Sequence, residues 1–354
     1  MTFTIINNEK SFIEIQQEWE ELQIETDISF YSTYAYLFNW YKYHNSKLKE
    51  LQIICVYKNK KIIAIAPLSL TNKKFLFFKG IELNFMGKAD FHNFIIDKNE
   101  KKQSIIKYIF KIINNDISWD RVMFSHIAHN TDLASFFLKS EQFNSKFEFL
   151  GENPILNLKK NSDFLTYKKS FFKKNITYYR NKLKRDLDVN FEVIHGNNND
   201  VLNEIATIHI NRNKERRSLF KDETAYGALK QLYKDDEHTV TFVLKTKEGG
   251  IISYATCYLF NRVIHNWNTS FSLDYRDYSV GDLIYFEMIN YAFDNKEIIN
   301  YIDFGAGRYP WKFRMTNTFI STYTFTLNNE KSKKHFLLQG YDKLFKIAKI
   351  ILNK

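Results

Sequence analysis

The 354-residue sequence has few cysteines and no long apolar run. The two cysteines, Cys55 and Cys257, are too few for a disulfide framework, and alone they cannot hold a structural zinc ion. Both lie in apolar runs typical of strands, so we interpret them as buried, reduced thiols, with a catalytic thiol as the less favoured alternative. The most apolar stretch, residues 62–70, contains Pro67 and is much shorter than the roughly 18 residues that a membrane-spanning helix needs.

The first residues also lack the pattern of a secretory signal, since no basic start is followed by an apolar run and a small-residue cleavage site. We interpret residues 1–9 as a first strand of the mature protein. A cytoplasmic location is therefore expected, with attachment at the inner face of the membrane as a further option. With 44% hydrophobic and 17% aromatic residues, the chain has enough apolar material for packed globular domains.

The formal net charge is +11, and the excess is concentrated in one segment. Residues 159–188 hold ten basic and three acidic side chains, a net charge of +7. An apolar stripe through Phe172, Ile176, Tyr179, Leu183 and Leu187 predicts a single helix here. We favour a linker helix docked by this stripe, with its basic face in water, over a wall for a polyanionic ligand.

Two stretches of the chain share one order of elements. A helix over residues 11–25 is followed by a strand at 51–57, a Lys-rich turn and a second strand at 62–68. A helix over 200–213 is followed in the same way by strands at 239–244 and 251–259. A duplicated domain explains this order. We therefore expect an N-terminal domain over 1–158, a basic linker helix over 159–190 and a C-terminal domain over 191–354.

The last stretch, residues 336–352, is amphipathic, with Lys343, Lys346 and Lys349 opposite several leucines and isoleucines. We expect a terminal helix that packs on the second domain. Peripheral attachment to a membrane surface is the alternative.

A polar loop with one glycine runs directly into a strongly apolar helix that starts at Leu283. The free N–H groups and the dipole at the start of such a helix make an anion site that suits a pyrophosphate. The residues expected to form it are Arg276, Ser279, Val280, Gly281, Asp282 and Leu283.

A buried strand at 301–305 then ends in a carboxylate and a glycine, and the loop 303–312 follows. Gly305 and Gly307 permit tight turns, and Arg308, Tyr309 and Lys312 project from this loop. From the residues alone, a structural turn with solvated charges and a catalytic loop are equally supported.

These elements in this order resemble the cellulose-biosynthesis-associated (CelD/BcsL) acetyltransferases of the GNAT superfamily, which is related to the Fem peptidyltransferases. The most specific part is Asp303-Phe304-Gly305-Ala306-Gly307 with Lys312. The sequence departs from the family pattern at Val280, where proline is usual, and at Trp311, where tyrosine is usual. The resemblance implies two tandem GNAT-like domains of mixed α/β type, with helices flanking mixed, mostly antiparallel sheets.

The resemblance also implies acyl transfer from acyl-CoA, with acetyl-CoA as the expected donor and no metal. The acceptor would be an amine of an envelope precursor, a polysaccharide or a small metabolite. It implies His265 or Asp303 as base and Tyr309 as acid for the leaving thiolate. Substrate contacts are expected from Asp90, His92, Arg308 and Lys312.

Three alternatives remain at this point. A Fem-like transferase would use aminoacyl-tRNA as donor, but no sustained heptad run predicts the coiled-coil arm that often accompanies that class. A nucleic-acid-binding protein would use the basic segment 159–188, although no recognised motif accompanies it, so nucleic acid is not the expected partner. A degenerate transferase could serve as a scaffold. The sequence does not indicate the oligomeric state.

Overall fold

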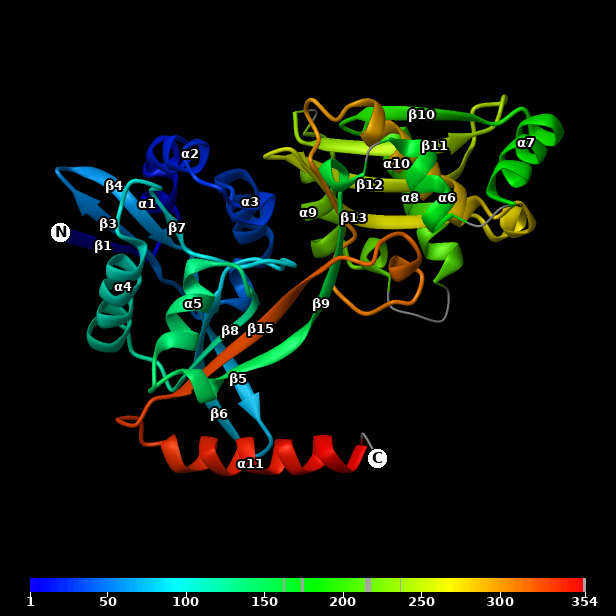
Figure 1. Ribbon diagram of the computed structural model, residues 1–354. Coiled ribbons are helices and arrows are strands. Elements are labelled where there is room, and N and C mark those ends of the chain that lie inside the picture. Colours follow the sequence, from blue (N-terminus) through cyan, green and yellow to red (C-terminus); the bar gives the residue numbers. More distant parts are fainter. Residues whose placement is uncertain (162, 173–174, 214–217, 236, 353–354) are drawn as a thin grey trace. The chain divides into compact units, whose positions relative to one another are not determined.

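The computed structural model describes the chain except residues 162, 173–174, 214–217, 236 and 353–354 and the side chains of residues 346, 349, 350 and 352. It divides into two compact units, residues 1–151 with 321–354 and residues 152–320. The chain passes between the units within strand β9 and again within strand β15 (Figure 1). Residues 321–354, which the sequence analysis placed in the second domain, lie in unit 1 because β15 pairs with β8 there.

Unit 1 contains two groups of paired strands. One has the order β1-β3-β4-β7, and the other runs β15-β8-β6-β5-β2. The elements are β1 Thr2–Ile6, α1 Glu9–Glu14, α2 Gln16–Ile24, η1 Phe30–Ser32, α3 Tyr34–His44, η2 Asn45–Lys47, β2 Glu50–Leu51, β3 Ile53–Lys58, β4 Lys61–Ala66, β5 Leu68–Phe75, β6 Phe78–Phe85, β7 Ile95–Ile96, α4 Lys102–Asp116, β8 Arg121–Ala128, α5 Asp132–Lys139, η3 Asn144–Lys146, the first part of β9 Phe147–Asn157, most of β15 Phe319–Asn328 and α11 His335–Leu352.

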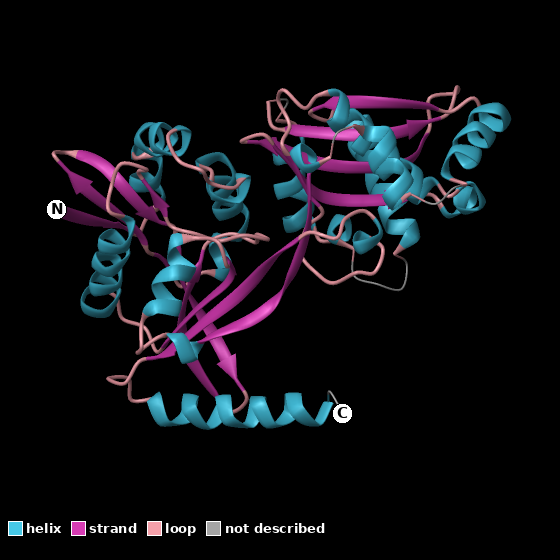
Figure 2. Ribbon diagram, in the orientation of Figure 1, coloured by secondary structure: helices cyan, strands magenta, loops and turns pink. Residues whose placement is uncertain are grey.

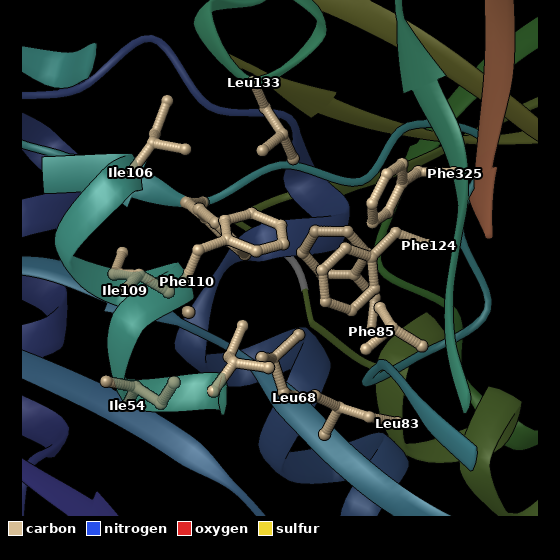
Figure 3. Packing of buried hydrophobic residues seen from close by; sticks show 14 of the residues in the cluster. Ile54, Leu68, Leu83, Phe85, Ile106, Ile109, Phe110, Phe124, Leu133 and Phe325 are labelled. Atoms are coloured by element: carbon tan, nitrogen blue, oxygen red, sulfur yellow. The ribbon is translucent and has the colours of Figure 1, made fainter. Parts of the chain in front are cut away.

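The core of unit 1 is built from aromatic and branched side chains of its strands and of α4 and α5. Figure 3 shows Phe110 of α4 and Phe124 of β8 facing one another beside Phe325 of β15. Phe325 stacks on Phe137 of α5 with ring centroids 3.9 Å apart, so a strand from the end of the chain completes this core. Such packing stabilises the fold mainly by removing apolar surface from water.

Unit 2 is a sheet with the strand order β10-β11-β12-β13-β14-β9, and Figure 2 shows helices packed against it. Its elements are the end of β9, η4 Leu158–Lys160, α6 Phe164–Phe171, α7 Ile176–Leu187, β10 Asn190–His195, α8 Asn199–Arg212, η5 Leu219–Lys221, α9 Glu223–Tyr233, β11 Thr239–Lys245, β12 Ile251–Phe260, β13 Val263–Phe271, η6 Leu273–Tyr278, α10 Val280–Asp294, β14 Tyr301–Asp303, η7 Lys312–Arg314 and the start of β15.

The two faces of the unit 2 sheet carry different helices. Cys257 of β12 contacts Met288 of α10, so the odd-numbered residues of this part of β12 face α10. Tyr258, the next residue, packs near Tyr233 of α9 on the other face. Most strand pairs in both units are antiparallel, and β6–β8 and β13–β14 are parallel. The predicted mixed α/β class with helices flanking mixed sheets is confirmed.

Both predicted hairpins are present, as β3–β4 and β11–β12. The first turns through Asn59 and Lys60, which both have positive φ, as a tight two-residue hairpin turn requires. The strand expected over 62–68 is interrupted at Pro67, since β4 ends at Ala66 and β5 begins at Leu68. Proline has no N–H for the ladder, which explains the break.

The predicted single helix of the basic segment is two helices, α6 and α7. Phe172, which ends α6, has an extended backbone with ψ 145°, so the apolar stripe does not run along one helix. Lys173 and Lys174 lie outside the described residues. The segment docks on unit 2 as expected, because Ile176 and Leu183 are buried and Arg180 pairs with Glu287 of α10.

The helix expected over 11–25 is likewise divided at Ile15, between α1 and α2. The terminal helix α11 packs on unit 1 and not on the second domain. Its Tyr341 meets Phe75 of β5, and Asp342 pairs with Arg121 of β8. No described helix is both long enough and apolar enough to cross a membrane.

Candidate active site

His265 and Asp303 form a buried pair on adjacent strands of unit 2. The parallel register of β13 and β14 places them opposite one another, and His265 Nδ1 lies 3.2 Å from Asp303 Oδ2. Their side chains are only 5% and 3% exposed. A carboxylate that accepts a hydrogen bond from one imidazole nitrogen fixes the orientation and tautomer of the ring, which is how a histidine base is positioned.

The ladder between β13 and β14 ends at this pair. Its last partners are His265 and Asp303, although β13 continues to Phe271. The pairing of β12 with β13 also shifts just beyond this point, where Trp267 is an extra residue between Asn266 and Asn268. Bulges of this kind redirect side chains and occur next to active sites. The sheet therefore opens beside His265 and Asp303.

The loop after Asp303 is held by its own side chains and backbone. Asp303 Oδ1 accepts a hydrogen bond from the Gly305 N–H at 2.9 Å. Gly305 and Gly307 have φ of 79° and 103°, which confirms the predicted need for glycine at both turns. The Lys312 ammonium is buried and donates to the carbonyls of Gly305 and Ala306, both at 2.7 Å. The structure thus gives Lys312 a role in fixing the loop, and its expected contact with substrate stays a prediction.

Arg308 and Tyr309 of this loop face solvent. The Arg308 guanidinium forms an ion pair with Glu152 at 3.0 Å. The Tyr309 side chain is 58% exposed, and the Lys312 ammonium lies 5.2 Å from its ring centroid. Their proposed substrate and acid roles remain predictions.

The predicted anion loop ends where α10 begins. Ser279, with φ 55°, precedes the helix, and the N–H groups of Asp282 and Leu283 both bond to its carbonyl at 3.0 Å. The N–H groups of the first helical residues, Val280 and Gly281, have no intrahelical acceptor by the geometry of an α-helix. Val280 and Leu283 point their side chains into the core, so only their backbone is available to a ligand.

Gly281 is required at its position by close packing. A Cβ atom there would lie 2.7 Å from Cε1 of Phe271, which is closer than carbon atoms approach one another. The aromatic ring therefore lies directly against the first turn of α10. This contact brings the end of β13 beside the helix N-terminus.

A cavity of about 480 Å³ lies at this junction. It is lined by residues of the end of α8, β13, η6, α10, the loop after β14 and η7: Arg212, Thr269, Phe271, Arg276, Ser279, Gly281, Asp282, Tyr285, Trp311 and Arg314. Three guanidinium groups and a helix N-terminus around one cavity favour a ligand with several negative charges. Asp282 offsets part of this charge, since its carboxylate lies 3.4 Å from Arg314.

The wall of the cavity contains a chain of hydrogen-bonded polar side chains. Asn266 Nδ2 donates to the Tyr285 hydroxyl at 3.1 Å, and that hydroxyl donates to Thr269 Oγ1 at 3.1 Å. Burial raises the pKa of the Tyr285 phenol, so it is a neutral donor at physiological pH. Arg212 lies flat on Phe271, with its guanidinium carbon 3.6 Å from the ring centroid.

The structure brings only some of the predicted site residues together. Arg276, Ser279, Gly281 and Asp282 line the cavity. His265 pairs in register with Tyr258, on the sheet face opposite α10, while Asn266 and Thr269 face α10. The His265–Asp303 pair and the cavity therefore lie on opposite faces of the sheet, and β13 contributes residues to both.

Asp90 and His92 belong to unit 1, whereas the other predicted site residues belong to unit 2. His92 is buried, stacks on Phe85 and donates from Nδ1 to the Ser125 carbonyl at 3.1 Å. Burial lowers its pKa to about 4. This environment is that of a packed neutral histidine, and its proposed contact with substrate stays a prediction.

The sequence analysis did not select Arg212, Asn266, Thr269, Tyr285 or Arg314. Tyr285 had a usable signal, because a hydroxyl four residues after Gly281 lies over the start of an otherwise apolar helix. Arg212 had none, since α8 is far from the anion loop in the sequence, whereas Arg314 lies only two residues beyond the selected Lys312. Cys55 and Cys257 are buried, and burial raises the pKa of both thiols. The described residues include no group of three or more His, Cys, Asp or Glu side chains suited to a metal ion.

Part of the chain is similar in sequence to a known family of enzymes. Residues 170–313, which lie in unit 2, match the family model described as "Acetyltransferase (GNAT) domain". The match confirms the predicted enzyme class, an acyltransferase of the GNAT type. No curated protein matches the chain.

Solved structures of similar fold extend over nearly the whole chain. FemX is 14% identical with a TM-score of 0.61, covering 93% of this chain and 98% of its own. L-PGS from Bacillus licheniformis is 13% identical with a TM-score of 0.57, covering 92% and 96%. A tandem GNAT protein from the clavulanic acid biosynthesis pathway is 8% identical with a TM-score of 0.51, covering 94% and 100%. These likenesses establish a tandem GNAT-like fold.

Proposed function

We propose that unit 2 transfers an acyl group from acyl-CoA, with acetyl-CoA as the first donor to test, to an amine. The observation that carries this proposal is the arginine-lined cavity at the start of α10, which is lined in part by Thr269 and Phe271 of β13, the strand that also carries His265. The pyrophosphate of CoA suits the N–H groups of Val280 and Gly281. Arg212, Arg276 and Arg314 would neutralise the remaining phosphate charge.

In this proposal, the donor lies on the α10 face and the acceptor approaches from the face that carries His265. Beyond His265, β13 is no longer paired with β14, and alternate backbone N–H groups of β13 point toward that edge. One of these N–H groups would donate to the thioester oxygen. The thioester carbon would then lie in the opening, between the two faces of the sheet.

The reaction follows from these positions. The amine nitrogen attacks the thioester carbonyl carbon, a C–N bond forms, and the C–S bond breaks. His265, oriented by Asp303, takes the proton that the nitrogen loses. The leaving thiolate takes a proton from solvent or from Tyr309, whose hydroxyl is exposed on the loop after β14.

The class of acceptor is part of the proposal and follows the resemblance to the CelD/BcsL acetyltransferases. An amine of an envelope precursor, a polysaccharide or a small metabolite is proposed on that basis. A cytoplasmic site of action belongs to the same proposal.

A second donor, aminoacyl-tRNA, is favoured by one observation. A smaller cavity of about 90 Å³ shares Ser279, Asp282 and Arg314 with the first and extends between α10 and the basic helices α6 and α7. Lys169, Lys184 and Arg185 on these helices are exposed. A polyanion much larger than CoA could contact them together with the cavity.

Release of free thiol from acetyl-CoA, measured with a panel of primary amines, tests the proposal. We expect amine-dependent release that is lost in Gly281→Glu, because the new side chain would displace the Phe271 ring from the first turn of α10 and its carboxylate would repel the anion. An unchanged melting temperature would show that this variant still folds. Leu165→Glu on α6 is a matched control, since Leu165 is exposed. Absence of turnover with acetyl-CoA and longer acyl-CoA thioesters, together with salt-sensitive binding of aminoacyl-tRNA, would replace the first donor with the second.

A further inference from the structure

Helix α11 has two apolar faces, and only one of them packs on the protein. On the inner face, Leu338 is fully buried and Tyr341 packs against Phe75 of β5 with ring centroids 5.2 Å apart. Asp342 also turns inward, where its carboxylate lies 3.0 Å from the Arg121 guanidinium. Figure 1 shows α11 lying along the ends of β5 and β6. The helix is thus fixed to unit 1 along one side.

The opposite face of α11 is apolar and exposed to solvent. Successive steps of four, four, three and four residues along a helix keep side chains on one side. Such steps connect Phe336, Gly340, Leu344, Ile347 and Ile351, and the four large side chains among them are 82%, 56%, 54% and 66% exposed. The solvent side of a surface helix is normally polar, so a stripe of this kind marks an interaction site.

A second exposed apolar point lies beside this stripe. The turn between β5 and β6 carries Leu76 and Phe77, and the Phe77 side chain is 94% exposed. This turn follows directly on Phe75, which packs on Tyr341 of α11. Phe77, Leu76 and the stripe of α11 therefore belong to one region of unit 1, which we call the α11 surface.

The charges around the α11 surface are basic. Lys73, Lys74 and Lys79 flank the β5–β6 turn, and Lys343 flanks the helix stripe, all of them exposed. Asp342, the acidic residue of the helix, forms an ion pair with Arg121 on the inner side. In a symmetric dimer, the same patch would face itself and bring these lysines near one another. A surface of anionic lipid satisfies both the apolar side chains and the lysines.

We infer that the α11 surface binds an anionic lipid bilayer. The helix lies parallel to the plane of the membrane, with Phe336, Leu344, Ile347 and Ile351 at the boundary between headgroups and acyl chains. Phe77 inserts beside them as a second anchor, and the lysines remain among the headgroups. The inference rests on unit 1 alone, so it does not depend on the reaction proposed for unit 2.

Flotation of the full chain with lipid vesicles tests this inference. The two vesicle types are phosphatidylcholine alone and phosphatidylcholine mixed with phosphatidylglycerol. We expect binding to the mixed vesicles that weakens as salt rises, and much weaker binding to phosphatidylcholine alone. The double variant Leu344→Gln/Ile347→Gln and the variant Phe77→Ser should each lower the partition coefficient by about tenfold or more.

Two further variants distinguish binding through the α11 surface from non-specific hydrophobic adsorption to the vesicles. Ile24→Gln removes an equally exposed side chain from α2 of the same unit and should leave binding unchanged. Lys73→Glu/Lys74→Glu should reduce binding to the mixed vesicles and remove most of its salt dependence. Unchanged circular dichroism and melting temperature would show that all variants fold, as expected for exposed positions.

Three outcomes would overturn the inference. The chain could fail to bind either vesicle type, or Leu344→Gln/Ile347→Gln could bind as strongly as the unaltered chain. The chain could also be a dimer in sedimentation equilibrium that this double variant dissociates, without any vesicle binding. In that last case, a second copy of the chain covers the stripe.

Discussion

The imidazole of His265 and the carboxylate of Asp303 face each other at 3.2 Å at the last paired position of β13 and β14. We expect His265→Gln to lower the rate of thiol release from acetyl-CoA in the presence of amines by about 10²- to 10⁴-fold, as is usual for loss of a general base. Binding of CoA, measured by calorimetry, should change little because His265 does not line the cavity.

Asp303 is expected to contribute to the reaction by orienting His265. Asp303→Asn keeps a side-chain oxygen that can accept from the Gly305 N–H, but it removes the charge that stabilises protonated His265. The rate should fall, because the imidazole loses the carboxylate that orients it and that stabilises the imidazolium formed when it takes the proton from the amine. An unchanged rate in Asp303→Asn would exclude this positioning role.

The buried ammonium of Lys312 is expected to stabilise the folded chain. Lys312→Met removes both hydrogen bonds to the carbonyls of Gly305 and Ala306 and leaves these acceptors poorly satisfied. The free energy of unfolding should fall by about 1–3 kcal/mol, measured by denaturant titration. Lys331→Met, at an exposed position, is the control and should have little effect. An equally small effect at Lys312 would contradict its structural role.

The arginines of the cavity make a prediction about affinity. Arg314→Gln and Arg212→Gln should each weaken CoA binding by about tenfold and reduce its salt dependence, because each removes a charge-assisted contact to phosphate. Arg185→Gln on α7 should not affect CoA binding, since Arg185 already pairs with Asp186 away from the cavity lining. A loss in Arg185→Gln comparable with that in Arg314→Gln would point to a larger polyanion.

The buried histidine of unit 1 makes a prediction about pH. Burial lowers the pKa of His92 from 6.5 to about 4, and its Nε2 has no hydrogen-bond partner among the described residues. The unfolded chain therefore binds a proton between these pH values while the folded chain does not. Stability should fall as pH drops from about 6.5 to about 4, by up to roughly 3 kcal/mol.

His92→Gln should remove this part of the pH dependence, as measured by the free energy of unfolding at several pH values. His129→Gln, at an exposed position in the same unit, should keep it. Identical pH dependence in His92→Gln and the unaltered chain would show that His92 does not carry the effect.

Local features of the fold could be predicted from the sequence, and long-range pairings could not. The two hairpins and the anion loop each depend on neighbouring residues, such as the turn at Asn59 and Lys60 or the start of α10 after Ser279. The return of β15 to β8 joins residues almost 200 positions apart in the sequence, as Thr322 opposite Ala128 shows. No turn or periodicity near either strand encodes that pairing.

In the candidate site, too, single residues could be predicted from the sequence, whereas their contacts could not. His265 and Asp303 were selected separately, but their contact depends on the parallel register of β13 and β14. Arg212 reaches the cavity because α8 packs near β13, and Phe271 offers it an aromatic surface. Lys312 was expected to reach outward, yet the turns at Gly305 and Gly307 expose carbonyls that bind its ammonium inside the loop.

Calorimetric titration of CoA into the full chain tests the central claim most directly, with Gly281→Glu as the matched variant. The account predicts saturable binding to the unaltered chain that weakens as salt rises and is abolished in Gly281→Glu. Absence of binding by both CoA and acetyl-CoA, or equal binding to Gly281→Glu, would contradict an acyl-CoA site at the start of α10.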